Sequence, residues 1–171
     1  MSNLSIPTDL LNRAVAGNAE AQFALAEIYM QSEDEDDNDH AEEWALKAAQ
    51  LGHIEAMYWL GEGYAFYAKE LLEEDPTESK TYFEHAFRWL EQASKLKHPA
   101  ALLELSNFYR RGDVVEKDLA KSVELVQQAA ELGEVQAMRD LACIYEHGMG
   151  IDVDIEKADF WNNQADAAEA E

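Results

Sequence analysis

A four-fold internal repeat constrains this chain more than any other feature of its sequence. Segments of thirteen residues align without gaps from Gly17, Gly52, Lys97 and Gly133. Counting each first residue as position 0, every segment has Ala at +4, Leu at +8 and Tyr at +12. A spacing of four residues places side chains on one stripe of an α-helix, so each segment is predicted to form a helix, helix A, with a buried Ala–Leu–Tyr stripe. The stripe residues are Ala21, Ala56, Ala101 and Ala137; Leu25, Leu60, Leu105 and Leu141; and Tyr29, Tyr64, Tyr109 and Tyr145.

A second helical pattern, helix B, follows each helix A. Its signature is a large residue followed by small residues four and five positions later. The large residues, all expected in the core, are Trp44, Trp89, Leu125 and Trp161. Gly52 and Gly133 stand where a left-handed residue commonly ends a helix. Lys97 takes this place before the third repeat, which predicts a junction that is either more strained or differently shaped. Pro99 suits the first turn of the following helix.

The repeats differ in how helix A is connected to helix B. In the second repeat an insertion is predicted to lengthen both helices, with helix A reaching about Glu74 and Asp75-Pro76 breaking it. Residues 31–39 of the first repeat are predicted to form an acidic loop. The third and fourth repeats have tight turns followed by Asp118 and Asp154 as helix N-caps. Before the repeats, residues 8–16 are predicted to form a capping helix with Thr8 as its N-cap.

These patterns predict an all-α fold, an α/α solenoid of about four helical hairpins with an N-terminal capping helix. The 171 residues are expected to form a single right-handed superhelical domain. Its predicted parts are the capping helix at 8–16 and repeats at 17–51, 52–96, 97–132 and 133–168. A β-sheet, or a first helix A that failed to span Ala21 to Tyr29, would contradict this interpretation. Leu60, Leu105, Tyr109 and Trp89 are expected to be buried between layers.

The pattern resembles the Sel1-like repeat family, whose helix A, Gly-rich turn and helix B follow one consensus. The fourth repeat matches it at Gly133, Ala137, Leu141, Tyr145, Gly148, Gly150, Ile151, Asp154, Ala158, Trp161 and Ala165. The third repeat keeps Gly112, Val115, Asp118, Ala129, Ala130 and Gly133, with Leu125 in place of Trp. The resemblance covers about residues 14–168 and implies a tetratricopeptide-like scaffold that binds proteins. The family's cysteine-rich branch does not fit, because Cys143 is the chain's one cysteine.

The net charge of the chain indicates which classes of binding partner are expected. The chain has 36 Asp and Glu against 13 Lys and Arg, a net charge of −23, which argues against nucleic acids and anionic membrane surfaces as direct partners. It favours either a protein partner with a basic surface or a role of the acidic residues in solubility alone. No signal peptide and no apolar stretch of about 18 residues is visible, so a cytoplasmic location is expected.

No motif indicates catalysis, a cofactor or a metal site. The histidines form no i, i+4 pair with one another, and the sequence has neither a nucleophile elbow nor a phosphate-binding Gly loop. No Cys–His nucleophile pair is apparent. Residues 33–39 carry six carboxylates in seven positions, but an EF-hand numbered from Asp34 has Asp39 at its Gly position and Ala45 at its final Glu position. The segment is therefore interpreted as a solvated acidic loop, with a weak, nonspecific site for divalent cations as the alternative.

The variable positions of helix A supply the candidate partner-binding site. Residues at +6, +7 and +10 change between repeats while the stripe stays fixed, so packing does not dictate them. The A helices are expected to line the concave face of the solenoid. The candidate residues combine large rings with carboxylates, which suits a basic partner. They are Phe23, Glu27, Tyr58, Trp59, Glu62 and Glu104. In the alternative interpretation, Phe23 and Leu103 pack between repeats, Trp59 belongs to the core and the Glu residues are only solvated.

Three functions remain open from the sequence. The first is a non-catalytic protein-interaction module. The second is an acidic immunity protein or antitoxin that inhibits a basic toxin or nuclease, since opposite charge speeds association. The third is a DNA mimic, which is disfavoured because the charge is uneven, at −15 over residues 1–85 and −8 over 86–171. The partner's identity and the oligomeric state are not encoded in any motif.

Overall fold

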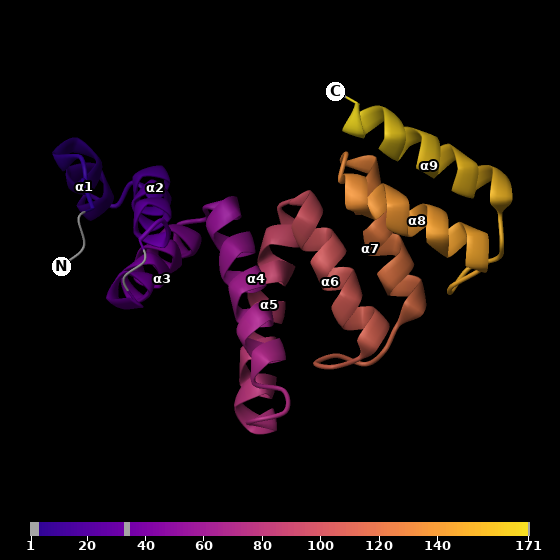
Figure 1. Ribbon diagram of the computed structural model, residues 1–171, viewed down its shortest axis with the longest axis horizontal. Helices are drawn as coiled ribbons and strands as arrows, with labels where there is room; N and C mark the ends of the chain where they lie inside the picture. Colours follow the sequence, from indigo (N-terminus) through magenta and orange to yellow (C-terminus); the bar gives the residue numbers. More distant parts are fainter. Residues whose placement is uncertain (1–3, 33–34, 171) are drawn as a thin grey trace. The chain divides into compact units, whose positions relative to one another are not determined.

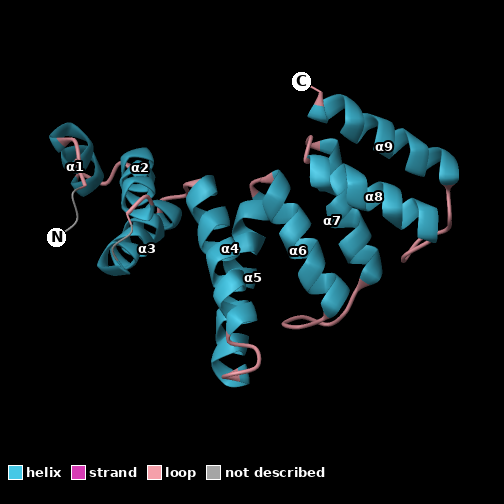
Figure 2. Ribbon diagram, in the orientation of Figure 1, coloured by secondary structure: helices cyan, strands magenta, loops and turns pink. Residues whose placement is uncertain are grey.

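The computed structural model describes residues 4–32 and 35–170, and this part of the chain forms nine α-helices and no strand (Figures 1 and 2). The prediction of an all-α fold is confirmed. The helices are α1 (Thr8–Val15), α2 (Ala19–Met30), α3 (Glu35–Gln50), α4 (Ile54–Glu70), α5 (Pro76–Lys95), α6 (Pro99–Arg111), α7 (Leu119–Glu131), α8 (Val135–His147) and α9 (Ile155–Glu169). Contacts divide the chain into two compact units, residues 1–60 and residues 61–171, and each is described by itself.

In the first unit, α1 packs on α2, and α2 packs on α3. Its core holds Ala14, Ala21 and Leu25. The buried Gln22 side chain ties α1 to α2, because its Nε2 donates to the carbonyl oxygen of Ala14 at 3.0 Å. The prediction that Thr8 caps α1 is wrong. Pro7, in an extended conformation, occupies the cap position and makes no side-chain cap, so Thr8 is already the first helical residue.

The acidic loop of the first repeat is shorter than predicted. Helix α3 begins at Glu35, so its first turns include most of the carboxylates assigned to a loop. Asp37 is only 5% exposed, and its Oδ2 accepts a hydrogen bond from the Ser32 hydroxyl at 2.5 Å. This bond holds the start of the helix against the end of α2, which is why the carboxylate is not solvated there. Glu33 and Asp34, part of the same predicted loop, lie outside the described residues.

In the second unit, α5 packs on α6, α6 on α7, α7 on α8 and α8 on α9. Ala101 and Leu105 of α6 are buried, as are Ala137 and Leu141 of α8. The corresponding Ala and Leu residues of the first two repeats are also buried. The predicted Ala and Leu stripes are therefore confirmed in all four repeats.

The aromatic residues of the pattern are less buried than predicted. Trp44, Trp89 and Trp161 were expected in the core, yet each is only half-buried, and so is Tyr109. Large rings of this kind lie across the edge of a core with one face in solvent. Trp44 illustrates the arrangement, because the Nζ atom of Lys47 lies 4.0 Å from the centroid of its ring.

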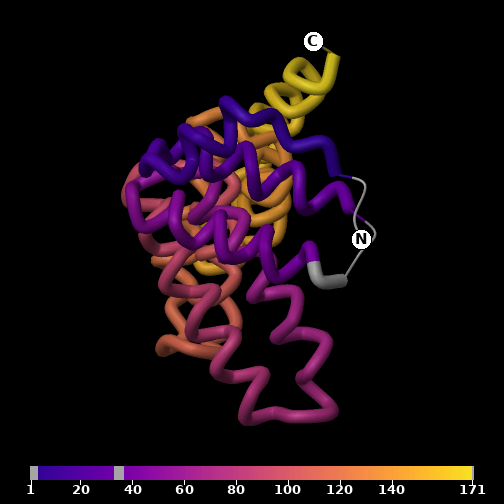
Figure 3. The backbone as a smooth tube through the Cα atoms, turned by 90° about the vertical axis from the view of Figure 1, so that its left-hand side faces the viewer, coloured from indigo at the N-terminus to yellow at the C-terminus, as the bar shows by residue number. Residues whose placement is uncertain are grey.

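The second repeat closes with an elongated helical hairpin (Figure 3). The prediction that helix A of this repeat reaches about Glu74 is wrong, because α4 ends at Glu70 and residues 71–74 form turns. The Asp75 N–H donates to the Leu71 carbonyl oxygen at 2.8 Å and closes this turn. Asp75 caps α5, and Pro76 occupies its first turn. Helices α4 and α5 approach closely at Gly61, where a Cβ atom would stand 2.6 Å from the Cγ of Leu90.

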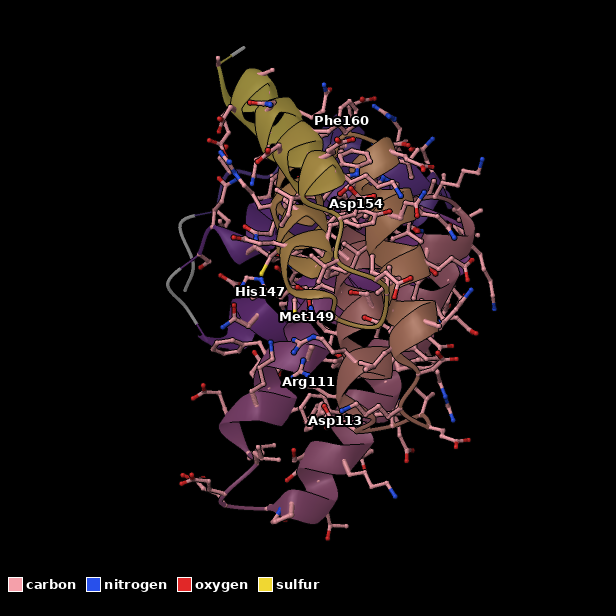
Figure 4. All side chains as sticks on the ribbon, turned by 90° about the vertical axis from the view of Figure 1, so that its right-hand side faces the viewer. Arg111, Asp113, His147, Met149, Asp154 and Phe160 are labelled. Atoms are coloured by element: carbon pink, nitrogen blue, oxygen red, sulfur yellow. The ribbon has the colours of Figure 1, made fainter. Side chains whose placement is uncertain are left out.

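The third and fourth repeats close with glycine turns instead. Gly112 and Gly148 are left-handed C-caps of α6 and α8. The predicted N-caps are confirmed, since Asp118 accepts from the Lys121 N–H at 2.9 Å and Asp154 from the Lys157 N–H at 3.0 Å. Figure 4 labels Arg111 and Asp113 at the turn of the third repeat, and Met149 and Asp154 at the turn of the fourth.

The junctions between repeats follow the sequence prediction. Gly52 and Gly133 have φ of 93° and 94°, and Lys97, in the equivalent place, is the one non-glycine residue with positive φ in the described part, at 62°. His98, next along the chain, caps α6 through Nδ1, which accepts from the Ala101 N–H at 3.1 Å. His53 does the same for α4. Both histidines thus have the helix-end role that their position predicts.

Candidate functional site

Phe23, the first of the candidate binding residues, belongs to the first unit and lies beside the start of α4. The Phe23 ring on α2 lies 4.6 Å from the His53 ring, centroid to centroid. Because His53 Nδ1 accepts the cap hydrogen bond, its Nε2 carries the hydrogen and donates to the Glu20 carboxylate at 3.2 Å. Phe23 therefore has a packing contact as well as a half-exposed face.

Three further candidates lie in the same unit. Glu27 is exposed on α2, whereas Tyr58 and Trp59 on α4 are half-buried. A half-buried ring presents an edge or face to a ligand without the whole side chain leaving the core. These exposures agree with a surface role for the +6, +7 and +10 positions of the first two repeats.

The remaining two candidates belong to the second unit. Glu62 on α4 is exposed and Glu104 on α6 is half-buried. Leu103, at +6 of the third repeat, is 8% exposed and belongs to the core. Position +6 is therefore a packing position in that repeat rather than a surface one.

Position +6 has another role again in the fourth repeat. Arg139 of α8 donates from Nη2 to Asp166 at 2.6 Å and to Glu169 at 3.1 Å, both on α9. The hydrogen bond to Asp166, followed by the one to Glu169, raises the pKa of Arg139. This ion pair fixes α9 to α8, a function that the sequence analysis missed. The signal for it is the lone cation at a position occupied by Phe, Tyr and Leu in the other repeats.

A second recurring contact was also missed. The residue four positions before the large residue of helix B is basic in every repeat, namely His40, His85, Lys121 and Lys157. Three of these lie against the stripe Tyr of their own repeat. The Tyr29–His40 and Tyr64–His85 ring centroids are 5.3 and 5.6 Å apart, and Lys157 Nζ is 5.0 Å from the Tyr145 ring. These contacts orient the tyrosines at the half-exposed edge of each repeat.

The one cysteine has a histidine neighbour that the sequence analysis did not recognise. Cys143 Sγ lies 3.7 Å from Nδ1 of His147, one turn further along α8. The same Nδ1 is 3.0 Å from the backbone carbonyl oxygen of Cys143, to which it donates, so it is not placed to deprotonate the thiol. In the described part of the chain, no group of three or more His, Cys, Asp or Glu residues is arranged to hold a metal ion.

Paired antiparallel helices, repeated with a small–large stripe, place the chain among the α/α-repeat proteins, a class of binding scaffolds. The sequence profile of the Sel1 repeat matches residues 19–53, 54–98, 99–134 and 135–161. The chain therefore belongs to the Sel1-repeat family. Sel1 repeats generally serve as protein-interaction modules and are typically non-catalytic.

Two curated relatives are regulators. The chain is 32% identical over 149 residues to an exopolysaccharide production negative regulator of Rhizobium meliloti, covering 84% of this chain and 55% of that protein. It is 28% identical to the chitin synthase regulator SKT5 of Saccharomyces cerevisiae, covering 95% of this chain and 25% of that protein. The chain thus spans about half or less of the length of these relatives.

Solved structures share the fold. A protective antigen of uropathogenic Escherichia coli strains, with an SLR fold, has a TM-score of 0.79 at 27% identity, covering 95% of this chain and 33% of that one. A Sel1 repeat protein from Oxalobacter formigenes has a TM-score of 0.75 at 27% identity, covering 92% and 61%. None of the helices in the described residues has the length and apolar character that a bilayer crossing requires.

Proposed function

We propose that the chain is a cytoplasmic interaction module that binds a basic protein partner through the helix-A surface. This surface comprises Phe23, Glu27, Tyr58, Trp59, Glu62 and Glu104. The observation that carries the proposal is the pairing, in a Sel1-repeat scaffold, of exposed carboxylates at +10 with half-exposed rings at +6 and +7. These side chains lie outside the buried Ala and Leu stripe, at exposed or half-exposed positions that a partner can reach.

The curated relatives support a regulatory interaction of this kind. Both are described as regulators, of exopolysaccharide production and of chitin synthase, which fits a protein that acts by binding another protein. A second candidate is an immunity protein or antitoxin that blocks a basic toxin or nuclease. The net charge of −23 favours it, because opposite charges accelerate association and a fast-acting inhibitor gains most from this.

Affinity capture with the whole chain, followed by mass spectrometry, tests the proposal by identifying the partner. The double variant Glu27→Lys/Glu62→Lys should slow association by roughly an order of magnitude at low salt and reduce its salt dependence. Trp59→Ala should chiefly speed dissociation. Glu116→Lys, which introduces one charge reversal in the exposed turn of the third repeat, is the control. If the folded variants bind like the parent at low and high salt, the partner uses another surface.

A further inference from the structure

The elongated hairpin extends the Tyr64–His85 pair of the repeat pattern with three aromatic rings that the pattern does not require, Phe66, Tyr67 and Tyr82. Phe66, Tyr67, Tyr82, Tyr64 and His85 form this ring cluster, in that order. The Phe66–Tyr67 centroids are 6.0 Å apart, Tyr67–Tyr82 6.1 Å, Tyr82–Tyr64 6.0 Å and Tyr64–His85 5.6 Å. The rings come from both α4 and α5, so the surface depends on the pairing of the two helices.

The ring cluster is separate from the aromatic core between α5 and α6. Phe83 and Phe87 of α5 pack edge-on against Phe108 of α6, and Phe83 and Phe108 are buried. By contrast, Phe66 is 59% exposed and Tyr67 is 53% exposed. Core packing therefore does not explain why aromatic residues occupy these two positions.

The insertion is what creates the ring cluster. Helix α5 has 20 residues and α7 has 13, which at 1.5 Å per residue makes α5 about 10 Å longer. Seven residues before the large residue of helix B, the third and fourth repeats have the N-cap residues Asp118 and Asp154, whereas the second repeat has Tyr82 within a helix. Because α5 has extra turns at its start, the ring of Tyr82 occupies the position that an N-cap aspartate has in the third and fourth repeats.

Carboxylates border the rings at helical spacing. Glu70 follows Phe66 by four residues on α4, and Glu78 precedes Tyr82 by four residues on α5, so each lies one turn away on the same stripe. Both are exposed. Residues 66–82 contain five acidic residues against Lys69 and Lys80, so the hairpin end is net negative.

Ring faces bordered by carboxylates define the ligand chemistry. An arginine guanidinium stacks on an aromatic face and pairs with a carboxylate through its edge, and it loses less hydration than an ammonium when it does so. A second copy of the chain is disfavoured because each copy carries a net charge of −23. We propose that the ring cluster binds an arginine-bearing segment of a partner polypeptide. The inference goes beyond the proposed function, because the ring cluster shares no residue with the helix-A surface.

A matched pair of peptides tests the proposal on the whole chain. The probes are fluorescein-labelled (Gly-Arg)₄ and (Gly-Lys)₄, which have equal charge, and binding is followed by fluorescence anisotropy. The parent should bind the arginine peptide about 3- to 30-fold more tightly than the lysine peptide, the range that guanidinium–ring contacts span. Equal affinity for the two peptides would overturn the proposal, since charge alone would then account for binding.

Variants distinguish the rings from their surroundings. The double variant Phe66→Leu/Tyr67→Leu keeps apolar side chains but removes two rings, and it should bring the arginine peptide down to the affinity of the lysine peptide. Phe160→Leu, at an exposed ring of α9 that is 52% accessible, should change nothing. Trp59→Ala, in the helix-A surface, should also leave the arginine preference intact. A result that disproves binding at the helix-A surface can therefore be distinguished from one that disproves binding at the ring cluster.

Nuclear magnetic resonance of the parent chain provides a measurement that needs no variant. Ring signals of Tyr67 and Tyr82 should shift on titration with the arginine peptide and move less with the lysine peptide. If the folded Phe66→Leu/Tyr67→Leu variant still prefers the arginine peptide, the arginine site lies outside the ring cluster and the proposal is overturned. The same conclusion follows if the parent prefers the arginine peptide without shifts of the Tyr67 and Tyr82 signals. Tighter binding of a proline-rich peptide without arginine would assign the ring cluster to a different ligand and overturn the proposal.

Discussion

The second and third repeats have the same buried stripe but close their hairpins in different ways. In the third repeat a left-handed Gly112 turns the chain, and the Asp118 N–H bonds to the Tyr109 carbonyl oxygen at 2.8 Å. In the second repeat, α4 and α5 continue side by side to a turn at residues 71–75. The stripe sets how helices pair, whereas the closing end is free to vary, and there the second repeat gains exposed rings.

The largest expected effect is a difference in stability between variants of the buried stripe and variants of the ring cluster. Leu105 is only 4% exposed, so Leu105→Ala should lower the free energy of unfolding by roughly 2–5 kcal/mol. Tyr67→Ala, in the exposed ring cluster, should lower it by less than about 0.5 kcal/mol. Urea unfolding of both variants measures the difference. An unchanged thermal midpoint for Leu105→Ala would contradict the assignment of this stripe to the core.

The close approach of α4 and α5 predicts the next largest effect. A Cβ atom on Gly61 would stand 2.6 Å from the Cγ of Leu90, whose side chain is wholly buried. Gly61→Ala should therefore destabilise the chain by about 1–2 kcal/mol, although alanine favours helix. Gly63→Ala in the same helix is the control, because nothing lies within 4 Å of its added Cβ. It should stabilise by up to about 1 kcal/mol, and equal effects at the two glycines would contradict the predicted clash.

The two kinds of closing end should be similar in the strength of their caps. Asp75 accepts from the Thr77 and Glu78 N–H groups, and Asp118 from the Lys121 N–H. Replacing either by Ala should lower the free energy of unfolding by about 0.5–2 kcal/mol. Since each cap bonds to N–H groups of its own helix, the double variant should show the sum of the two losses. A coupling above about 0.5 kcal/mol would mean that the closing ends are not independent.

The smallest effect concerns the junction between the two repeats. Lys97 has φ of 62°, a conformation that costs a residue with a Cβ atom about 1 kcal/mol and glycine almost nothing. Lys97→Gly should therefore raise the thermal midpoint, by an amount equivalent to roughly 0.5–1 kcal/mol. The reverse change, Gly133→Lys at the next junction, should lower it. A destabilised Lys97→Gly variant would show that the lysine side chain makes a stabilising contact that exceeds its backbone strain.

Acid should release one cap of the fourth repeat. The backbone N–H of Lys157, then its side chain, lowers the pKa of Asp154 below its ordinary value. A depressed pKa stabilises the fold above the unfolded-state pKa, and this contribution disappears as the pH falls through the folded value, below about pH 4. The carboxyl signal of Asp154, followed by nuclear magnetic resonance, should titrate below that of an unfolded Asp. Titration at or above the unfolded value would contradict the cap.

The sequence by itself determined the repeat, its stripe and its local ends. Ala101 and Leu105 were assigned to the core from spacing alone, because helical periodicity fixes which side chains share a face. The left-handed Lys97 and the Asp118 cap were likewise predictable, since each depends on neighbours within a few residues. The Sel1-like assignment followed from the same short-range pattern.

Tertiary structure decided what depends on residues far apart in the chain. Helix packing decides how far Trp89 and Tyr109 are exposed and where α3 starts. It also brings Arg139 and Glu169 together as an ion pair. So does the ring cluster, whose Tyr67 and Tyr82 meet only because α4 and α5 run side by side. Periodicity shows which residues face away from a helix's own stripe. Whether such a residue meets solvent, a cation or another ring is set by the neighbouring helix.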